Sequence, residues 1–593
     1  MASSLIEPIF SDEEDAAEYG FDMLREKREG PVVVAIDIGT TFSGYALSFS
    51  SDKYAIFAMK TTDPNRPRSG RQSTKVPTTL LLKPDCSFHS FGHQALVHYN
   101  RELDESEQKE WLYFERFKMK LHSQKKLTRQ TPVSAANGRE LPVGTIFAHA
   151  LRHFRNTALA ECKVYAGAEL KDTDVQWVVT VPAIWDGGAK QTMREAAYAA
   201  GLASEMKPEA VQIALEPESA SIYCKSLKRI GRSSEDAQYV CEAFMEGSTY
   251  LLADLGGGTA DVTVHKVSST GKMKERHRAT GGAWGGTYVD QNFVKLLESI
   301  FTKDWIRSYR DENPGDWVDL MTVKFETSKR LASANSTMYV EFPHSFHDFV
   351  RESGSSIERC ISSAKNPNLK FSRGSLAMKY AEVRKLFNSV LDNIVVHLKS
   401  VIKKVGGVNY IILVGGFATS QLLQTRIRDD FEKSLKLRVI IPPESSLAVV
   451  MGAVLFGHDP TQISSRCCRY SYGTDYIDTR SVKRDWKFQT YVKKNQEIGL
   501  NDKVTHTFRP LYAEQTKCKF GVYESDSENP VMINEPDVRE VASFVLPMPD
   551  TRKGLDRKIF TTMLFGLTEI AVESLDETSG KQIGGNVQLD FLS

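Results

Sequence analysis

The chain has 593 residues, of which 41% are hydrophobic and 25% are charged, and its 76 lysines and arginines balance its 75 aspartates and glutamates. This length exceeds the roughly 250–300 residues at which a single core stops growing, so we expect several lobes. The balanced charge excludes recruitment of nucleic acid or acidic lipid by bulk charge, and no apolar run approaches the roughly 18 residues that a membrane span needs.

The first 30 residues are acidic around positions 12–15 and lack the basic-then-apolar order of a signal peptide. We therefore expect residues 1–30 to be a disordered tail. Eight cysteines are scattered along the chain without metal-ligand spacing. This pattern favours reduced thiols in a reducing compartment, the cytoplasm or the nucleus.

Residues 32–49 contain the first of two similar turns. An apolar run ends at Asp37, and Gly39, Thr40 and Thr41 follow before a second apolar run. The pattern predicts two strands joined by a tight turn.

Aromatic and basic residues occur together over residues 111–121, where Lys118 is a candidate to face a cleft. An exposed surface lysine is the alternative interpretation. Apolar residues at helical spacing over residues 146–154 predict a helix with His149 and His153 on its solvent side.

Residues 175–181 and 213–215 each predict a strand followed by a helix. Asp186 is the expected N-cap of the first helix and Gly201 its end, and Pro217 begins the second, where a missing N–H is harmless. The second strand delivers Glu216 to its carboxyl end, which is where open α/β folds bind their ligands.

The second similar turn lies within residues 250–267, where two apolar runs flank Gly256–Gly258 and Thr259. Three residues without Cβ let backbone N–H groups close on an anion. Asp254 and Asp261 would put negative charge beside a phosphate, which makes sense only with a divalent cation between them. A glycine-rich β-hairpin that binds no ligand is the alternative.

Three later segments carry further candidate contacts. Residues 279–290 are a glycine-dense stretch before an amphipathic helix, which suits either a phosphate or a plain loop. Residues 325–333 predict a helix with one polar face, which is either a binding face or a solvated one. Residues 410–416 predict a buried strand that ends in two glycines, and a helix is expected at 446–457.

Two turns of the form strand, Asp, Gly, Thr in one chain suggest two similar halves that hold one nucleotide between them. The motifs over about residues 31–457 are similar to those of the nucleotide-binding domain of the seventy-kilodalton heat-shock proteins, a fold shared with actin and the sugar kinases. In order they are Asp37-Ile-Gly-Thr-Thr, Val181-Pro-Ala, Glu216-Pro, Asp254-Leu-Gly-Gly-Gly-Thr, Trp284-Gly-Gly, Glu326-x-x-Lys-Arg and Val414-Gly-Gly. Within that family they look closest to the divergent group called type twelve. The resemblance implies an α/β fold of two actin-like lobes, built from duplicated ribonuclease-H-like domains.

The resemblance also implies ATP or ADP held between the lobes with magnesium and potassium. The implied catalytic residues are Asp254, Glu216, Lys118 and Asp37, and the implied metal-side acids are Asp37 and Asp254. The implied phosphate contacts are Gly39, Thr40, Thr41, Gly256, Gly257, Gly258, Thr259, Gly285 and Gly286. The implied adenosine side comprises Glu326, Lys329, Arg330, Ser333, Gly415, Gly416, Phe417 and Glu444.

Three departures from the family pattern affect these expectations. Phe417 and Thr419 stand where the family has a serine and an adenine-stacking arginine, and Glu444 replaces a shorter acid. The segment 456–463 also lacks the acidic, leucine-rich character of the family's linker.

Residues 461–593 are expected to be all-β, with paired strands around residues 576–580 and a last strand at 587–592. They resemble the family's peptide-binding β-sandwich, and we expect no helical lid within them.

The function expected is that of a slow, chaperone-like ATPase that couples its nucleotide state to the binding of client peptides or proteins, with co-chaperones as implied partners. The alternative is a nucleotide-gated scaffold that does not hydrolyse ATP. A sugar kinase of the same fold is the third and least favoured interpretation, because no acceptor site is visible in the sequence.

Overall fold

The computed structural model describes residues 6–8, 31–62, 72–124, 126–167, 170–227, 237–478, 485–500, 502–565, 568–583 and 591–592. The expected tail, residues 1–30, lies outside them except for Ile6–Pro8, which form β1 and pair with β27 (Lys503–Pro510). Most of the last expected strand, 587–592, also lies outside. No helix within the described ranges combines the length and apolar character needed to cross a membrane.

The first lobe is built on a mixed six-stranded sheet with the order β14-β13-β2-β3-β4, and β7 pairs with β3. Its central strands β2 and β13 are buried at every position because they are mostly apolar and are covered on both faces. Helices α4 and α5 cover one face. The bounds are β2 Val32–Ile38, β3 Phe42–Phe49, β4 Asp52–Ala58, β7 Val76–Pro77, β13 Val175–Val181, β14 Val211–Leu215, α4 Val143–Ala166 and α5 Gly187–Ala200.

Helix α5 begins and ends where the sequence predicts. Asp186 caps it by accepting a hydrogen bond from the Ala189 N–H, and Gly201 ends it in a left-handed conformation. The expectation that His149 and His153 lie on the solvent side of α4 was wrong, since both are half-buried. The His149 ring stacks on Phe88 and the His153 ring on Phe88 and Phe91, because a three-stranded sheet covers that side of the helix (β8 Thr79–Leu82, β9 Phe88–Phe91 and β10 Leu112–Glu115).

The second lobe repeats the arrangement on a seven-stranded sheet with the order β22-β21-β15-β16-β17-β23-β26. In each lobe a β-hairpin pairs in parallel with a later strand: β2-β3 with β13, and β15-β16 with β21. The duplication expected from the two turns is therefore present in the topology. The bounds are β15 Thr249–Leu255, β16 Ala260–Val267, β17 Met273–Gly282, β21 Tyr410–Val414, β22 Arg438–Ile440, β23 Ile463–Cys467 and β26 Glu497–Gly499.

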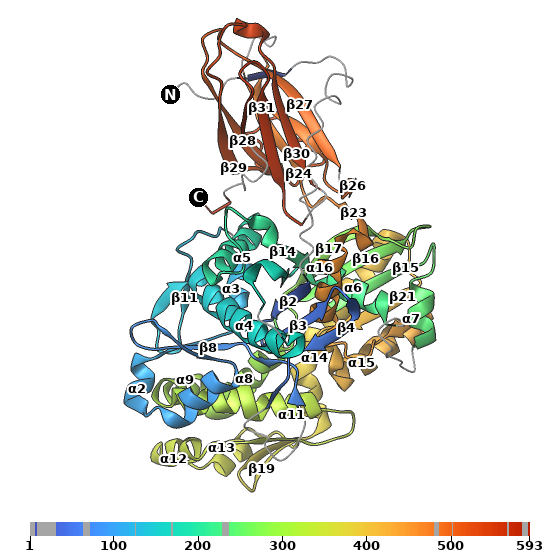
Figure 1. Ribbon diagram of the computed structural model, residues 1–593. Coiled ribbons are helices and arrows are strands. Elements are labelled where there is room, and N and C mark those ends of the chain that lie inside the picture. Colours follow the sequence, from blue (N-terminus) through green and yellow to red (C-terminus); the bar gives the residue numbers. More distant parts are fainter. Residues whose placement is uncertain are drawn as a thin grey trace.

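Two helices, α6 (Glu216–Ser226) and α16 (Ala448–His458), pack between the two sheets and join them through one core. Val33 and Ala35 of β2 enter this core, as do Leu252 of β15 and Val414 of β21. The outer face of the second sheet is covered by α8 (Thr287–Phe301), α14 (Tyr380–Val405) and α15 (Gln421–Arg428). The ends of both hairpins are thus fixed relative to each other (Figure 1).

The remaining elements of the two lobes are short and lie around this frame. They are β5 Thr61–Thr62, β6 Gln72–Ser73, β11 Pro132–Ser134, β12 Glu140–Pro142, β18 Met338–Glu341, β19 Leu369–Ser372, β20 Ser375–Met378, α1 His93–Val97, α2 Glu105–Glu110, α3 Lys118–Ser123, α7 Ala237–Ala243, α9 Lys303–Glu312, α10 Pro314–Val318, α11 Glu326–Leu331, α12 His344–Glu352 and α13 Ile357–Ser363.

The C-terminal part contains two antiparallel sheets, with the orders β1-β27-β30-β31-β32 and β25-β24-β28-β29. Side chains from both sheets share one apolar core that includes Phe508, Phe520 and Phe544, and the hairpin expected around residues 576–580 joins β31 to β32. The bounds are β24 Ser471–Ile477, β25 Trp486–Val492, β28 Lys517–Ser525, β29 Val538–Pro547, β30 Ile559–Leu564, β31 Ala571–Asp576 and β32 Lys581–Ile583.

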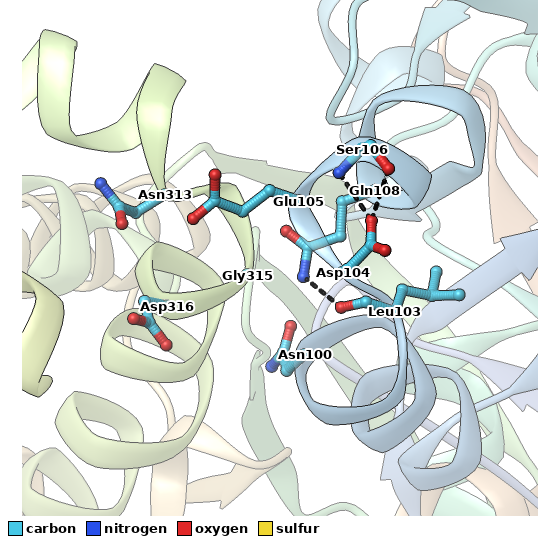
Figure 2. A pocket seen from close by; sticks show the side chains of 9 residues that line it. All are labelled: Asn100, Leu103, Asp104, Glu105, Ser106, Gln108, Asn313, Gly315 and Asp316. Atoms are coloured by element: carbon cyan, nitrogen blue, oxygen red, sulfur yellow. Dashed lines mark hydrogen bonds between the residues drawn. The ribbon is translucent and has the colours of Figure 1, made fainter.

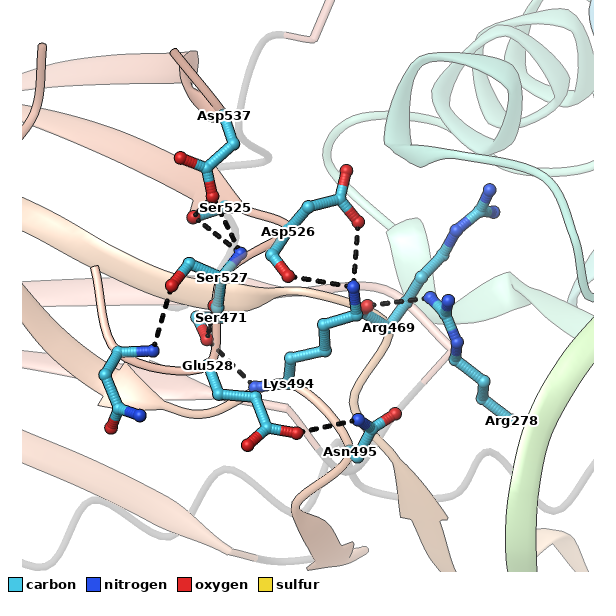
Figure 3. A network of polar contacts seen from close by, with 11 residues as sticks. Arg278, Arg469, Ser471, Lys494, Asn495, Ser525, Asp526, Ser527, Glu528 and Asp537 are labelled. Carbon is cyan, nitrogen blue, oxygen red and sulfur yellow. Dashed lines mark hydrogen bonds and ion pairs between the residues drawn. The ribbon is translucent and has the colours of Figure 1, made fainter. Parts of the chain in front are cut away.

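The C-terminal part is attached to both lobes (Figure 1). Strand β23, inside the range 461–593, pairs in parallel with β17 of the second lobe, and Arg466 on β23 makes a buried bidentate ion pair with Glu218 of α6. Farther on, Arg278 of β17 donates a hydrogen bond to the Arg469 carbonyl at 2.9 Å (Figure 3). The connection is therefore an ordered part of the second sheet.

Candidate functional site

The first turn joins β2 to β3, and Asp37 precedes it on β2 with its carboxylate almost fully buried. Asp37 Oδ1 accepts a hydrogen bond from Thr180 Oγ1 at 2.9 Å, and Oδ2 accepts one from Lys75 Nζ at 2.7 Å. Burial raises the pKa of Asp37, but the Lys75 and Lys118 ammonium groups outweigh burial, so this pKa lies below its ordinary value. Asp37 is therefore held as a carboxylate.

The second turn joins β15 to β16, and Asp254 and Asp261 face each other across that ladder, both buried. Asp261 Oδ2 accepts a hydrogen bond from Thr259 Oγ1 at 3.0 Å, while its Oδ1 is buried without a partner among the described residues. Burial, and next the Glu216 carboxylate, raise the pKa of Asp261 to about 7. Burial, Glu216 and Asp261 raise the pKa of Asp254 well above its ordinary value. Both acids therefore lack compensating positive charge.

Lys118 and Glu216 form a buried ion pair close to Asp37 and Asp254. Lys118 begins α3 and Glu216 begins α6, and the Nζ–Oε1 distance is 2.6 Å. Burial would lower the pKa of Lys118, but Glu216 and then Asp37 raise it above its ordinary value. Lys118 thus faces the acids and is not the exposed surface lysine of the alternative interpretation.

The two turns touch each other across the boundary between the lobes. A Cβ built on Gly257 would lie 2.3 Å from Thr41 Oγ1, and one built on Gly258 would lie 2.5 Å from Thr40 Oγ1. Glycine is therefore required at both positions for this approach. Gly256 N–H donates within its own turn, to the Thr259 carbonyl at 3.0 Å.

The third glycine turn supports the second one. The N–H groups of Gly285, Gly286 and Thr287 donate to the carbonyls of Gly258, Gly256 and Gly257 at 3.1, 3.1 and 2.8 Å. Because these donors already have partners, Gly285 and Gly286 fix the shape of the second turn in this structure. The first turn is fixed in a similar way, since the Gly39 carbonyl accepts a hydrogen bond from Thr78 Oγ1 at 2.8 Å.

The residues expected at adenosine form a charged cluster on α11 beside the cleft. Lys329 is buried, with Nζ 2.6 Å from Asp290 Oδ1 and 2.5 Å from Glu326 Oε2. Arg330 pairs with Glu326 at 2.7 Å, and its guanidinium lies 4.2 Å from the centre of the Phe42 ring in the first lobe. The polar face of this helix therefore reaches the first lobe through Arg330, but it is partly solvated, since the Arg330 side chain is 53% exposed, and the i, i+3 ion pair of the alternative interpretation is present.

Ser333 follows α11 and donates a hydrogen bond to Ser336 Oγ at 3.0 Å. Arg116, which the sequence did not single out, pairs across the lobes with Asp290 at 2.9 Å.

The loop after β21 supports Asp254 from the other side. Gly415 has φ +92°, and a Cβ there would lie 2.5 Å from Asp254 Oδ1, so only glycine permits this contact. Phe417, which follows Gly416, is 7% exposed and stacks on Phe387 in the second-lobe core. Glu444, with φ +52°, stands in the turn before α16.

The acid cluster suits a hydrated divalent cation better than a directly ligated one. Of the four buried carboxyl groups, Asp37 and Glu216 are paired with Lys75 and Lys118, whereas Asp254 and Asp261 have raised pKa values and room for a further cation beside them. Within the described part of the chain, no three His, Cys, Asp or Glu side chains converge as a metal-binding group. A Mg²⁺ ion that keeps several waters and binds phosphate oxygens needs no such group, so the residues fit it.

Four side chains of the site were not predicted from the sequence, although two of them had a signal. Thr180 is a polar residue near the end of a buried, mostly apolar strand, and Asp290 is an acid in the first turn of α8 shortly after the glycines. Lys75 and Arg116 carried no such signal, because their partners come from other parts of the chain.

A separate pocket of about 510 Å³ lies away from the acid cluster, between α2 of the first lobe and α10 of the second (Figure 2). Its polar lining includes Asp104, Glu105 and Asp316. Asp104 already caps α2, and Asp316 accepts a hydrogen bond from Ser345. None of the residues expected at the nucleotide lines this pocket.

The chain is similar to known proteins over nearly its whole length. The family model described as "Hsp70 protein" matches residues 114–530. Heat shock 70 kDa protein 12A of Mus musculus is 36% identical over 96% of this chain and 93% of its own length. Heat shock 70 kDa protein 12B of Homo sapiens is 36% identical over 95% and 91%. Chaperone protein DnaK of Buchnera aphidicola subsp. Schizaphis graminum is 26% identical over 53% of this chain and 42% of its own length.

Proposed function

The chain belongs to the Hsp70 family, a family of nucleotide-binding ATPases, and from this premise we propose that it binds ATP or ADP with Mg²⁺ between its two lobes and hydrolyses ATP slowly. We further propose that its nucleotide state controls the binding of client peptides or proteins by the two C-terminal sheets, with co-chaperones as regulators and potassium as a second ion. The observation that carries this proposal is the facing pair of glycine turns above four buried acids.

The side chains divide the work of phosphoryl transfer to water among them. The Lys118 ammonium would donate to a terminal phosphate oxygen, and Glu216, whose Oε1 lies 2.6 Å from Lys118 Nζ, would accept a proton from the attacking water. Asp254 and Asp261 would hold a hydrated cation through their carboxylates. Bound Mg²⁺ would supply positive charge that offsets both the phosphate oxygens and these acids.

The cellular compartment proposed is the cytoplasm or the nucleus. All eight cysteines are free thiols in the structure, which supports a reducing environment.

Two measurements test the proposal. Isothermal titration with ATP, ADP and GTP, each with Mg²⁺, tests the site, the base and the metal together. We expect Asp254→Asn to lower ATP turnover by about 10²–10³-fold, because it removes a charge positioned for the transition state. The variant should fold at least as stably without ligand, since a buried charge among like charges is lost. Unchanged turnover in this variant would refute the assignment of Asp254.

The second candidate function is a nucleotide-gated scaffold without hydrolysis. Two observations favour it: Phe417 is packed in the core beside Phe387, and Arg330 is engaged by Phe42. Nucleotide binding without turnover above background, in wild type and Asp254→Asn alike, would select the scaffold.

A further inference from the structure

Among the described residues, Lys75 is the cation that contacts the carboxylate of Asp37 directly, and neither the motifs nor the comparisons assign it a role. It follows β6 (Gln72–Ser73) and precedes β7, and its Nζ lies 2.7 Å from Asp37 Oδ2. The Lys75 side chain is 18% exposed, so it comes from the rim of the cleft and reaches inward. An ammonium has three donors, and the contact with Asp37 uses one of them.

The approach of Lys75 depends on the residue opposite Asp37. Gly44 pairs with Asp37 in the β2-β3 ladder. A Cβ on Gly44 would lie 3.3 Å from Lys75 Cγ and 3.0 Å from the Thr74 carbonyl. Because Gly44 has no side chain, the aliphatic stem of Lys75 can pass over β3 and reach Asp37. Gly44 and Asp37 are register partners, so the pairing of β2 with β3 puts this space next to the acid.

The contact between Lys75 and Asp37 affects how charge is distributed between the two sides of the site. Lys118 is paired with Glu216 at 2.6 Å, and Lys75 is paired with Asp37 at 2.7 Å. Each lysine thus neutralises one of the acids on the first-lobe side, while Asp254 and Asp261 stay uncompensated on the second-lobe side. Asp37 lies next to the turn Gly39–Thr41, which is expected to contact phosphate. The Lys75 ammonium is therefore close to the place where the phosphates would bind.

We propose that Lys75 is a fixed cation of the nucleotide site, which occupies the metal side of Asp37 and contributes positive charge toward the nucleotide phosphates. Where the acid has no lysine partner, a divalent cation alone neutralises the phosphate charge. Here Lys75 would supply part of that positive charge. Nucleotide binding should therefore tolerate removal of Mg²⁺. This inference rests on the proposed nucleotide binding and extends it to the metal dependence of affinity.

The test compares nucleotide affinity with and without the metal. ADP and ATP are titrated into wild type, Lys75→Met and the control Lys60→Met, each in excess Mg²⁺ and in EDTA. Lys60 is an exposed lysine just after β4, so its replacement controls for the loss of one positive charge. We expect wild type and Lys60→Met to lose less than about tenfold in affinity without Mg²⁺, and Lys75→Met to lose at least about tenfold more than they do.

Gly44→Ala provides a second variant that leaves Lys75 in place. Its methyl group would crowd the Lys75 stem at 3.3 Å, so it should shift the metal dependence in the same direction by a smaller factor. Thermal melting of each variant shows whether the fold is retained.

The outcomes separate this inference from the function on which it rests. If Lys75→Met loses the same factor in Mg²⁺ as in EDTA, or loses nothing in either, Lys75 is not a substitute for metal charge and the inference is overturned. If wild type binds no nucleotide even with Mg²⁺, the proposed function fails first.

Discussion

Single residues show how strongly burial changes the chemistry of a side chain in this chain. His153 is a polar residue at a helical position that looks solvent-facing in the sequence, yet the rings of Phe88, Phe91 and Phe154 surround it. Burial alone lowers the pKa of His153 to about 4. The imidazole is thus neutral in the folded protein over a pH range in which an unfolded chain would protonate it.

This difference predicts an acid-sensitive contribution to stability. Between pH 6.5 and 4 the unfolded state binds the additional proton, so stability falls as the pH is lowered. We expect the stability of wild type relative to His153→Leu to fall by about 2 kcal/mol between pH 7 and pH 5. Urea-induced unfolding at both pH values measures it, with exposed His344→Leu as the control. A pH-independent difference between wild type and His153→Leu would show that His153 does not remain neutral in the fold.

At the scale of elements, the sequence predicted the parts of the site that are local. Both hairpins with their aspartates, the Asp186 cap and the glycine turns arise from residues that are neighbours in the chain. The contacts between elements could not be predicted, because they depend on how the lobes meet. Lys75, for example, reaches Asp37 only through strand register, and Phe417 turns into the core because Phe387 of α14 is there.

The contact between the turns Gly39–Thr41 and Gly256–Thr259 leads to a prediction about nucleotide binding. Gly257→Ala places a methyl group 2.3 Å from Thr41 Oγ1, so the turns must separate, whereas Gly256→Ala places one 3.5 Å from the Thr259 carbonyl and demands little. We expect Gly257→Ala to weaken nucleotide binding by about tenfold or more, since the amide donors shift away from the phosphates. Gly256→Ala should lose much less. Equal losses in the two variants, measured by titration with ADP and Mg²⁺, would mean that the contact between the lobes is irrelevant to binding.

At the scale of the whole molecule, helix α5 connects the nucleotide-binding lobes to the C-terminal sheets. Lys190 donates a hydrogen bond to the Thr568 carbonyl at 2.8 Å, and Arg194 makes a bidentate ion pair with Glu569. Both partners lie between β30 and β31. The same helix also contacts Phe591, whose N–H donates to Gln191 Oε1 at 2.7 Å. These contacts join the first lobe to the sheets proposed to bind clients, and we expect a movement of this lobe to reach those sheets through α5.

We expect the Arg194–Glu569 ion pair to hold the C-terminal sheets against the first lobe. The Arg194 side chain is 1% exposed and that of Glu569 is 26% exposed, so Glu569→Ala would leave a buried guanidinium without its carboxylate. Breaking such a pair typically costs about 3–5 kcal/mol, and we expect this cost to appear as undocking of the C-terminal sheets.

The same helix supplies the matched control. Glu195 pairs with Arg129 at 2.8 Å, but their side chains are 33% and 47% exposed, and such surface pairs contribute at most about 1 kcal/mol. Limited proteolysis and hydrogen exchange over residues 459–470 should report faster opening in Glu569→Ala than in Glu195→Ala. If both variants open alike, the buried pair does not hold the parts together, and the other contacts, among them β23 with its Arg466–Glu218 pair, carry the attachment.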